Sequence, residues 1–167
     1  MGYEFVNKAV SSGSDNTLKV TGIDSDDVYL LVLRLIQTQN NNEVISMRVT
    51  KSGTGVANNY HRQYQTINTA QAYYPSTNEG GTKSRIIENV DDDYGGGQSL
   101  LYLYNFNSSS EYSFWTNENV AIVSNQTLGS QGGGVHKIAS ASDGVEILGN
   151  SNGTFINGAS AILYKVT

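Results

Sequence analysis

The chain closes with Asn152-Gly-Thr-Phe-Ile-Asn-Gly-Ala-Ser-Ala-Ile-Leu-Tyr-Lys-Val-Thr167, which reads as a turn, a short aromatic step, a second glycine turn and a final strand. Apolar residues occupy both faces of that strand, with Ile162 and Tyr164 on one and Ala161 and Leu163 on the other. A strand made last must lie beside or between strands made much earlier. The stretch therefore predicts antiparallel β structure with long-range pairing, and a strand covered on both sides.

The composition of the whole chain favours the same fold class. Its 167 residues include 18 Gly and 11 Tyr but only one Pro, and 15% of them are charged. Such a chain lacks the residues that surface helices need, whereas Tyr, Val, Ile and Thr suit a pleated, half-buried surface. We expect one all-β domain over residues 1–167, an antiparallel, jelly-roll-like β-sandwich of about ten strands without substantial helix. Residues 1–15 are expected to form an N-terminal edge strand or arm.

Two further segments carry strand signals. Val28–Ile36 is the strongest apolar run, and because Asp26 or Asp27 could cap a helix, periodicity alone leaves a helix open. The Asp-rich turn before it and its β-patterned neighbours favour a central strand covered on both faces. Tyr3–Val10 changes face near Val6, which predicts an irregular or edge strand.

Three segments look like connections. Residues 68–82 hold the only proline and a Gly-Gly pair, and they predict a long loop of the kind that is functional or contacts a neighbour. Gly129–Gly134 is expected to be a glycine-rich connection before a strand at Val135–Ala139. Asn107–Ser110 predicts a hairpin between the strands Ser99–Phe106 and Glu111–Thr116.

Charge and cysteine content narrow the class of partner. The formal net charge of −5 argues against unaided binding to nucleic acid or to an anionic membrane surface. The chain has no Cys, so it has no disulfides, no thiolate nucleophile and no cysteine zinc site. The first ten residues lack the pattern of a signal peptide. A protein or a sugar is the expected partner.

No constellation of catalytic or metal-binding residues stands out. His61 and His136 lie among polar β-patterned residues, without a nucleophile-elbow motif, and are expected to be satisfied or solvated. Asp24–Asp27 lacks the Gly and Glu that a calcium loop requires. Asp91–Asp93 could hold a cation or form a solvated turn. We assign no catalytic, cofactor or metal residues and expect a protein that is not an enzyme.

Aromatic residues are the candidate contact residues. Five of them are expected to be exposed, and they would serve either a subunit interface or a platform on which sugar rings stack. Tyr-rich strands are typical of β interfaces, so the interface reading is preferred. The five residues are Tyr60, Tyr64, Tyr73, Tyr74 and Trp115.

The order of short motifs resembles a family of small virion proteins of tailed bacteriophages, frequent among marine and cyanobacterial phages. The ending of that family runs through an aromatic residue, Gly, Ser and apolar residues to Leu-Tyr-Gly, and Lys165 stands here in place of the last Gly. The motifs that carry the resemblance are Thr21-Gly-Ile23, Val28-Tyr-Leu-Leu-Val32, Met47-Arg-Val49, Asn59-Tyr60, Leu101-Tyr-Leu-Tyr104, Gly153-Thr-Phe155, Gly158-Ala-Ser160 and Leu163-Tyr164.

This resemblance implies a jelly-roll-like sandwich, commonly a homotrimer, that decorates or cements a phage capsid or forms part of a head or tail fibre. The expected partners are then copies of the chain itself and the major capsid protein or another virion protein, and the expected location is the capsid surface. The alternative that it implies is a fibre module that recognises glycans on the host surface. No catalytic residue, cofactor, nucleic acid or membrane belongs to either role.

Overall fold

The computed structural model of the chain describes residues 2–69, 73–92, 96–124, 126–151 and 153–167, and for Tyr73 and Tyr74 it describes the backbone alone. These residues form strands and connections, and none of them forms a helix that could span a membrane. The strands are β1 (Tyr3–Val10), β2 (Thr17–Thr21), β3 (Tyr29–Ile36), β4 (Glu43–Lys51), β5 (Thr54–Gly55), β6 (Tyr60–Asn68), β7 (Tyr73–Gly81), β8 (Ser84–Val90), β9 (Gly97–Tyr104), β10 (Ser113–Val123), β11 (Gln126–His136), β12 (Gly144–Gly149) and β13 (Ser160–Val166).

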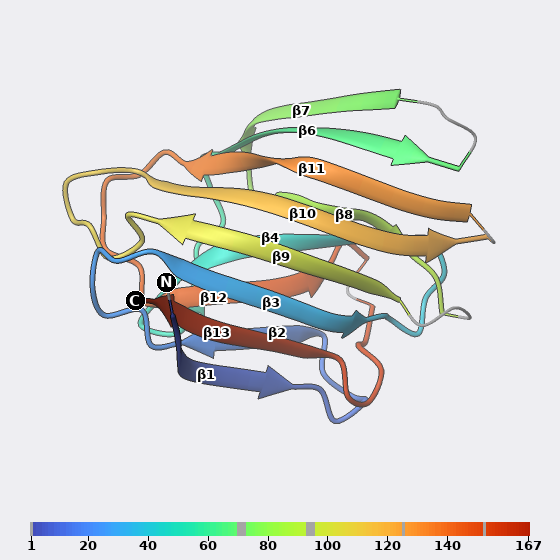
Figure 1. Ribbon diagram of the computed structural model, residues 1–167, viewed down its shortest axis with the longest axis horizontal. Helices are drawn as coiled ribbons and strands as arrows, with labels where there is room; N and C mark the ends of the chain where they lie inside the picture. The colour runs from blue at the N-terminus through green and yellow to red at the C-terminus, as the bar shows by residue number, and fades with distance from the viewer. Residues whose placement is uncertain (1, 70–72, 93–95, 125, 152) are drawn as a thin grey trace.

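Two antiparallel sheets face each other in a jelly-roll-like sandwich (Figure 1), which confirms the predicted fold class. The larger sheet has eight strands in the order β1-β13-β3-β9-β10-β11-β6-β7. The smaller has five, in the order β2-β12-β4-β5 with β8 also paired to β4. We call the side of the larger sheet that faces the smaller one its inner face, and the opposite side its outer face.

The C-terminal strand lies between two strands from the start of the chain, as the sequence predicted, but only its inner face is covered by the other sheet. β13 lies between β1 and β3 and pairs with both, so the last strand of the chain fills a gap between two of the first. Ala161 and Leu163 on its inner face are fully buried. Ile162 on the outer face is 8% exposed although no second layer covers it, because neighbouring side chains of the same sheet enclose it. Lys165 continues this strand without a positive φ.

The apolar run Val28–Ile36 forms β3, which confirms the strand interpretation over a helix. Tyr29, Leu31 and Leu33 point into the core and are at most 1% exposed. The other face is only partly covered, since Arg34 is exposed. The expected irregularity near Val6 is a register shift between Phe5 and Asn7 in the β1–β13 ladder.

The hydrophobic core fills the space between the sheets. The strands β2, β4, β9, β12 and β13 contribute hydrophobic side chains at alternate positions, which is the pattern of an antiparallel sandwich. The largest fully buried side chains are Tyr29, Tyr60, Phe106, Phe155, Leu31, Leu33, Ile36, Ile45, Met47, Ile87, Leu101 and Leu103.

Two predicted connections are strands instead, and the strand count is thirteen rather than about ten. Most of the predicted loop 68–82 is β7, an edge strand paired with β6, and residues 70–72 lie outside the described residues. Pro75 is tolerated there because an edge strand has one row of unpaired backbone groups. Gly129–Gly134 lies inside β11, with a neighbouring strand on each side.

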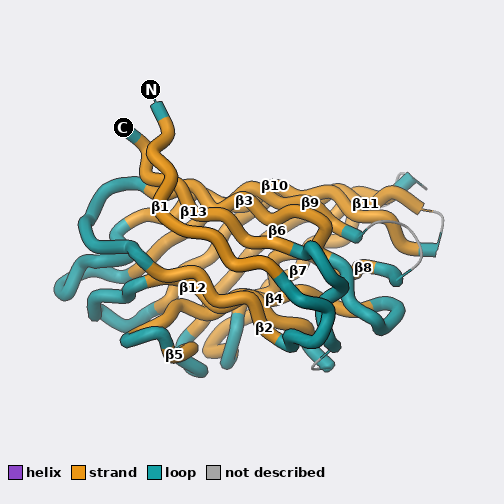
Figure 2. The backbone as a smooth tube through the Cα atoms, turned by 90° about the horizontal axis from the view of Figure 1, so that it is seen from below, coloured by secondary structure: helices purple, strands orange, loops and turns teal. Residues whose placement is uncertain are grey.

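The two ends of the chain form a short ribbon that projects from the sandwich. In Figure 2 they rise together above the eight-stranded sheet, on the side away from the smaller sheet. The backbone N–H of Gly2 donates to the carbonyl oxygen of Thr167 over 2.7 Å, and the N–H of Thr167 donates in return over 3.0 Å. Lower in this ribbon the rings of Phe5 and Tyr164 meet edge to face, with centroids 6.2 Å apart.

Candidate functional site

Three of the five aromatic residues predicted at an interface lie inside the sandwich. Tyr60, Tyr64 and Trp115 are 1%, 5% and 2% exposed, so the expectation that they are exposed is wrong. Their positions on β6 and β10 point inward, while the polar residues between them point outward. Neither interface contacts nor sugar stacking can use them without opening the fold. The side chains of Tyr73 and Tyr74 lie outside the described part of the chain.

Tyr60 has a structural role between the sheets. Its hydroxyl donates to the carbonyl oxygen of Val56 over 2.7 Å and accepts from the N–H of Val49 over 2.9 Å. Burial raises the pKa of this hydroxyl far above its usual value. The ring of Trp115 lies 6.3 Å away and that of His136 4.9 Å away, between centroids. These rings therefore form a packed aromatic cluster.

The two histidines differ in their surroundings. His61 is half-buried, whereas His136 is fully buried. Neither ring nitrogen of His136 has a hydrogen-bond partner among the described residues, so the expectation of a satisfied or solvated imidazole is wrong for this residue. Burial, with a smaller contribution from the positive charge of Lys51, lowers the pKa of His136 from 6.5 to about 4.

The stability of the fold is expected to depend on pH through His136. The unfolded chain binds a proton near pH 6.5 and the folded chain only near pH 4, so unfolding takes up a proton between these values. The contribution of the neutral His136 to the free energy of unfolding is fully present above pH 6.5. It is lost as the pH falls to about 4, which lowers the free energy of unfolding by up to about 3 kcal/mol. Urea unfolding at a series of pH values measures this. His136→Phe should flatten that part of the profile, and an unchanged profile would contradict the assignment.

Carboxylates of the two Asp-rich segments bond to other parts of the fold, as far as the structure describes them. Asp91 is 5% exposed, and its carboxylate accepts backbone N–H groups of Asn42 at 3.2 Å and Ser124 at 2.6 Å. Asp27 pairs with Lys165 at 2.6 Å. Asp93 lies outside the described residues. Among the residues that are described, no group of three or more His, Asp or Glu could hold a metal ion.

The exposed hydrophobic residues gather on one side of the molecule. Eight of the ten large hydrophobic side chains that the described residues expose lie on the outer face, as the alternation and register of their strands place them. Leu35 and Tyr112 are the other two. The eight are Tyr3, Phe5, Val10, Ile67, Leu100, Phe114, Val120 and Ile122. Apolar residues gathered on one face typically mark a binding surface.

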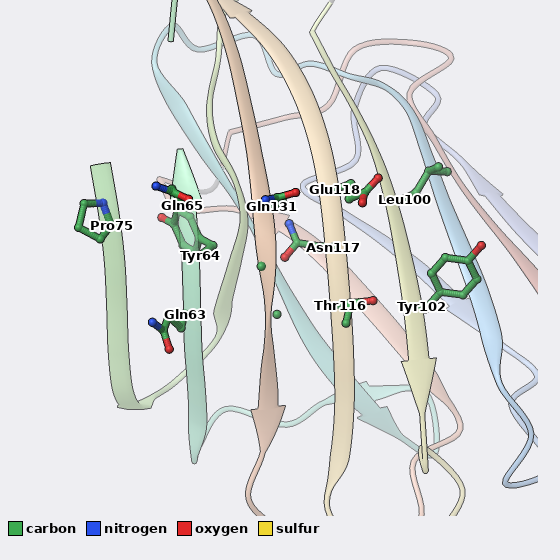
Figure 3. A pocket seen from close by; sticks show the side chains of 12 residues that line it. Gln63, Tyr64, Gln65, Pro75, Leu100, Tyr102, Thr116, Asn117, Glu118 and Gln131 are labelled. Carbon is green, nitrogen blue, oxygen red and sulfur yellow. The ribbon is translucent and has the colours of Figure 1, made fainter. Parts of the chain in front are cut away.

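A groove of about 950 Å³ with both polar and apolar lining lies over part of the same outer face (Figure 3). Its floor is β11, whose outward positions there are Gln131 and Gly133, and its sides are β6 and β10. We call it the β11 groove. The side chains that give it its chemistry are Gln63, Gln65, Tyr102, Thr116, Glu118 and Gln131.

Strand register places these polar side chains in two rows across the sheet. Gln65 pairs with Gln131, and Gln131 pairs with Glu118. In the next row Gly133 lies between Gln63 and Thr116. Because Gly133 has no side chain, the second row is interrupted at its middle, and the groove deepens there.

The sequence prediction missed the β11 groove. A local signal for its floor is present, however, in the glycine-rich segment Gly129–Gly134, which is bounded by strands. Comparison of the chain with protein-family models, with curated proteins and with solved structures finds no match. Function is therefore inferred from the apolar residues of the outer face and from the β11 groove.

Proposed function

We propose that this chain is a non-enzymatic structural protein of a tailed-bacteriophage virion, which decorates or cements the capsid by packing on other protein subunits. The observation that carries the proposal is the gathering of eight of the ten exposed large hydrophobic side chains on the outer face. The resemblance of the chain's motifs to small phage virion proteins supplies the class of particle.

The region beside the projecting ribbon suits a contact between copies of the chain. Tyr3 and Phe5 are 50% and 59% exposed, and Leu100 farther across the sheet is 45% exposed. A specific interface removes about 800 Å² from solvent on each partner, and its centre is rich in aromatic and aliphatic side chains and poor in charge. The outer side of β1, β13, β3 and β9 offers such a centre, and a homotrimer is the assembly that the resemblance implies.

Self-association through this region is tested by sedimentation velocity. The native chain is expected to sediment as a trimer, and Phe5→Ser should shift it toward monomer because it removes an exposed ring beside the ribbon. Tyr112→Ser is the matched control, since Tyr112 is 41% exposed but lies in the connection before β10, a strand that β13, β3 and β9 separate from β1. A native chain that is monomeric at all accessible concentrations would contradict the trimer.

The virion assignment needs a separate measurement. Antibody against the chain, applied to purified phage particles whose genome encodes it, is expected to label the capsid surface. Particles that contain none of the chain would refute the structural role. Label on the tail instead of the head would exclude decoration of the capsid and favour a fibre.

A further inference from the structure

We propose that the β11 groove binds a neutral oligosaccharide chain. This inference goes beyond packing on protein subunits and does not depend on it. The groove lies over β6, β11 and β10, and the proposed subunit contact extends from β1 toward β9, so the two surfaces meet at β9, where Leu100 borders both.

The dimensions of the groove follow from strand geometry. Its sides, β6 and β10, are separated by two strand spacings, about 10 Å. The lining residues run across the sheet from Pro75 on β7 to Leu100 and Tyr102 on β9, which are four strand spacings or about 19 Å apart. On β6, β10 and β11 the lining covers three residues each, and on β11 these are Gln131, Gly132 and Gly133. An extended chain of several sugar rings fits such a trough better than a compact ligand.

The floor cannot accept another strand. The backbone of β11 is already paired along its length with β10 on one side and β6 on the other. An extended peptide laid on this floor would therefore find no backbone partners, and β-augmentation requires a free sheet edge. Recognition in the groove must come from side chains.

The side chains of the groove have the hydrogen-bonding character that sugar hydroxyls match. Gln63, Gln65 and Gln131 each carry a carboxamide that both donates and accepts, as a hydroxyl does. None of these three carboxamides forms a hydrogen bond with another described residue. Thr116 adds a hydroxyl and Glu118 adds an acceptor. Vicinal hydroxyls of a sugar can bond to adjacent amides along and across the strands.

Charge selects among the sugars. Glu118 is the one charged side chain among the described residues that line the groove, and none of them is Lys or Arg. Sulfated, phosphorylated or sialylated glycans would place an anion near this carboxylate without a cation to offset it. Leu100 and Tyr102 border the groove on the β9 side and offer apolar surface to the C–H faces of a ring. Neutral hexose or pentose polymers are the class that this lining fits.

The proposal is tested by titrating the full chain, observed by amide NMR, with neutral oligosaccharides of four to six units. The probes are cello-, malto-, laminari-, manno- and xylo-oligosaccharides, with sialylated and sulfated glycans as a second arm. At least one neutral probe should shift the amides of β6, β10 and β11. The loss of one amide in Gln63→Ala or Gln131→Ala should weaken its affinity about fivefold to tenfold.

A blocking variant and a matched control complete the test. Thr116→Phe places a ring across from Gly133, an arrangement that sheets tolerate well, and should abolish binding in a folded protein. Gln126→Ala removes an exposed amide of β11 that does not line the groove and should leave affinity unchanged. Binding only to charged glycans, no binding to any neutral probe, or full binding by Thr116→Phe would each overturn the proposal. Sedimentation of these variants shows separately whether subunit packing is intact.

Discussion

Deletion of Ala161–Thr167 is expected to abolish folding. The deletion removes nearly all of β13, which pairs with β1 and β3, and β1 has no other partner in its sheet. It also removes the fully buried Ala161 and Leu163 from the core. Losing two strand pairings and part of the core costs more free energy than the roughly 5–15 kcal/mol by which a domain of this size is stable.

Circular dichroism and amide NMR would measure this outcome. The truncated chain is expected to show no cooperative thermal transition and poor dispersion of its amide resonances. Deletion of Thr167 alone is the control, because that residue lies beyond the last residue of β13 and its backbone hydrogen bonds to other described residues are those with Gly2 in the projecting ribbon. A cooperative transition in the longer deletion would show that β1 and β3 can close the sheet without β13.

Gly134→Val is expected to destabilise the fold by more than about 3 kcal/mol, because the core offers no room for a side chain at this position. A Cβ atom added there would lie 2.4 Å from Cζ2 of Trp115 and 2.7 Å from the carbonyl oxygen of His61. The indole is buried against Tyr60, and the carbonyl belongs to the paired strand β6, so neither can move at low cost.

Gly129→Val is the matched control on the same strand. A Cβ at Gly129 would meet only the carbonyl oxygen of Asn119, at 3.8 Å, which is ordinary contact. Its effect on stability is expected to be within about 0.5 kcal/mol, or favourable, since Val suits a strand better than Gly. Urea unfolding of both variants gives the two free energies. Equal losses of unfolding free energy in the two variants would mean that Trp115 and His61 shift and relieve the close contacts at Gly134.

The sequence predicted the parts of the fold that local pattern controls. β13 and β3 were recognisable because their apolar residues exceed what a solvent-facing strand would carry. The irregularity at Val6 was visible because one extra residue exchanges the inward and outward positions of a strand.

The segments that the sequence misread depend on partners distant in the chain. Gly132 and Gly134 look like a flexible turn, but their missing side chains make room for Tyr64 and Trp115 from neighbouring strands. The same contacts explain why these two aromatic residues are buried rather than exposed. The residues of the β11 groove come from separate strands that only register brings together, so the glycine-rich segment of β11 could not show which side chains lie beside it.

The pairing of Gly2 with Thr167 has a topological consequence. A short linker between these two residues would join β13 to β1 as a hairpin, and new ends could be opened at Gly53, whose surroundings are empty within 4 Å of an added Cβ. The contacts farthest apart in the present chain, such as Tyr3 with Val166, would become local ones. Because folding slows as contacting residues lie farther apart in sequence, this circular permutant would keep the sandwich and lower its contact order, and it would fold faster.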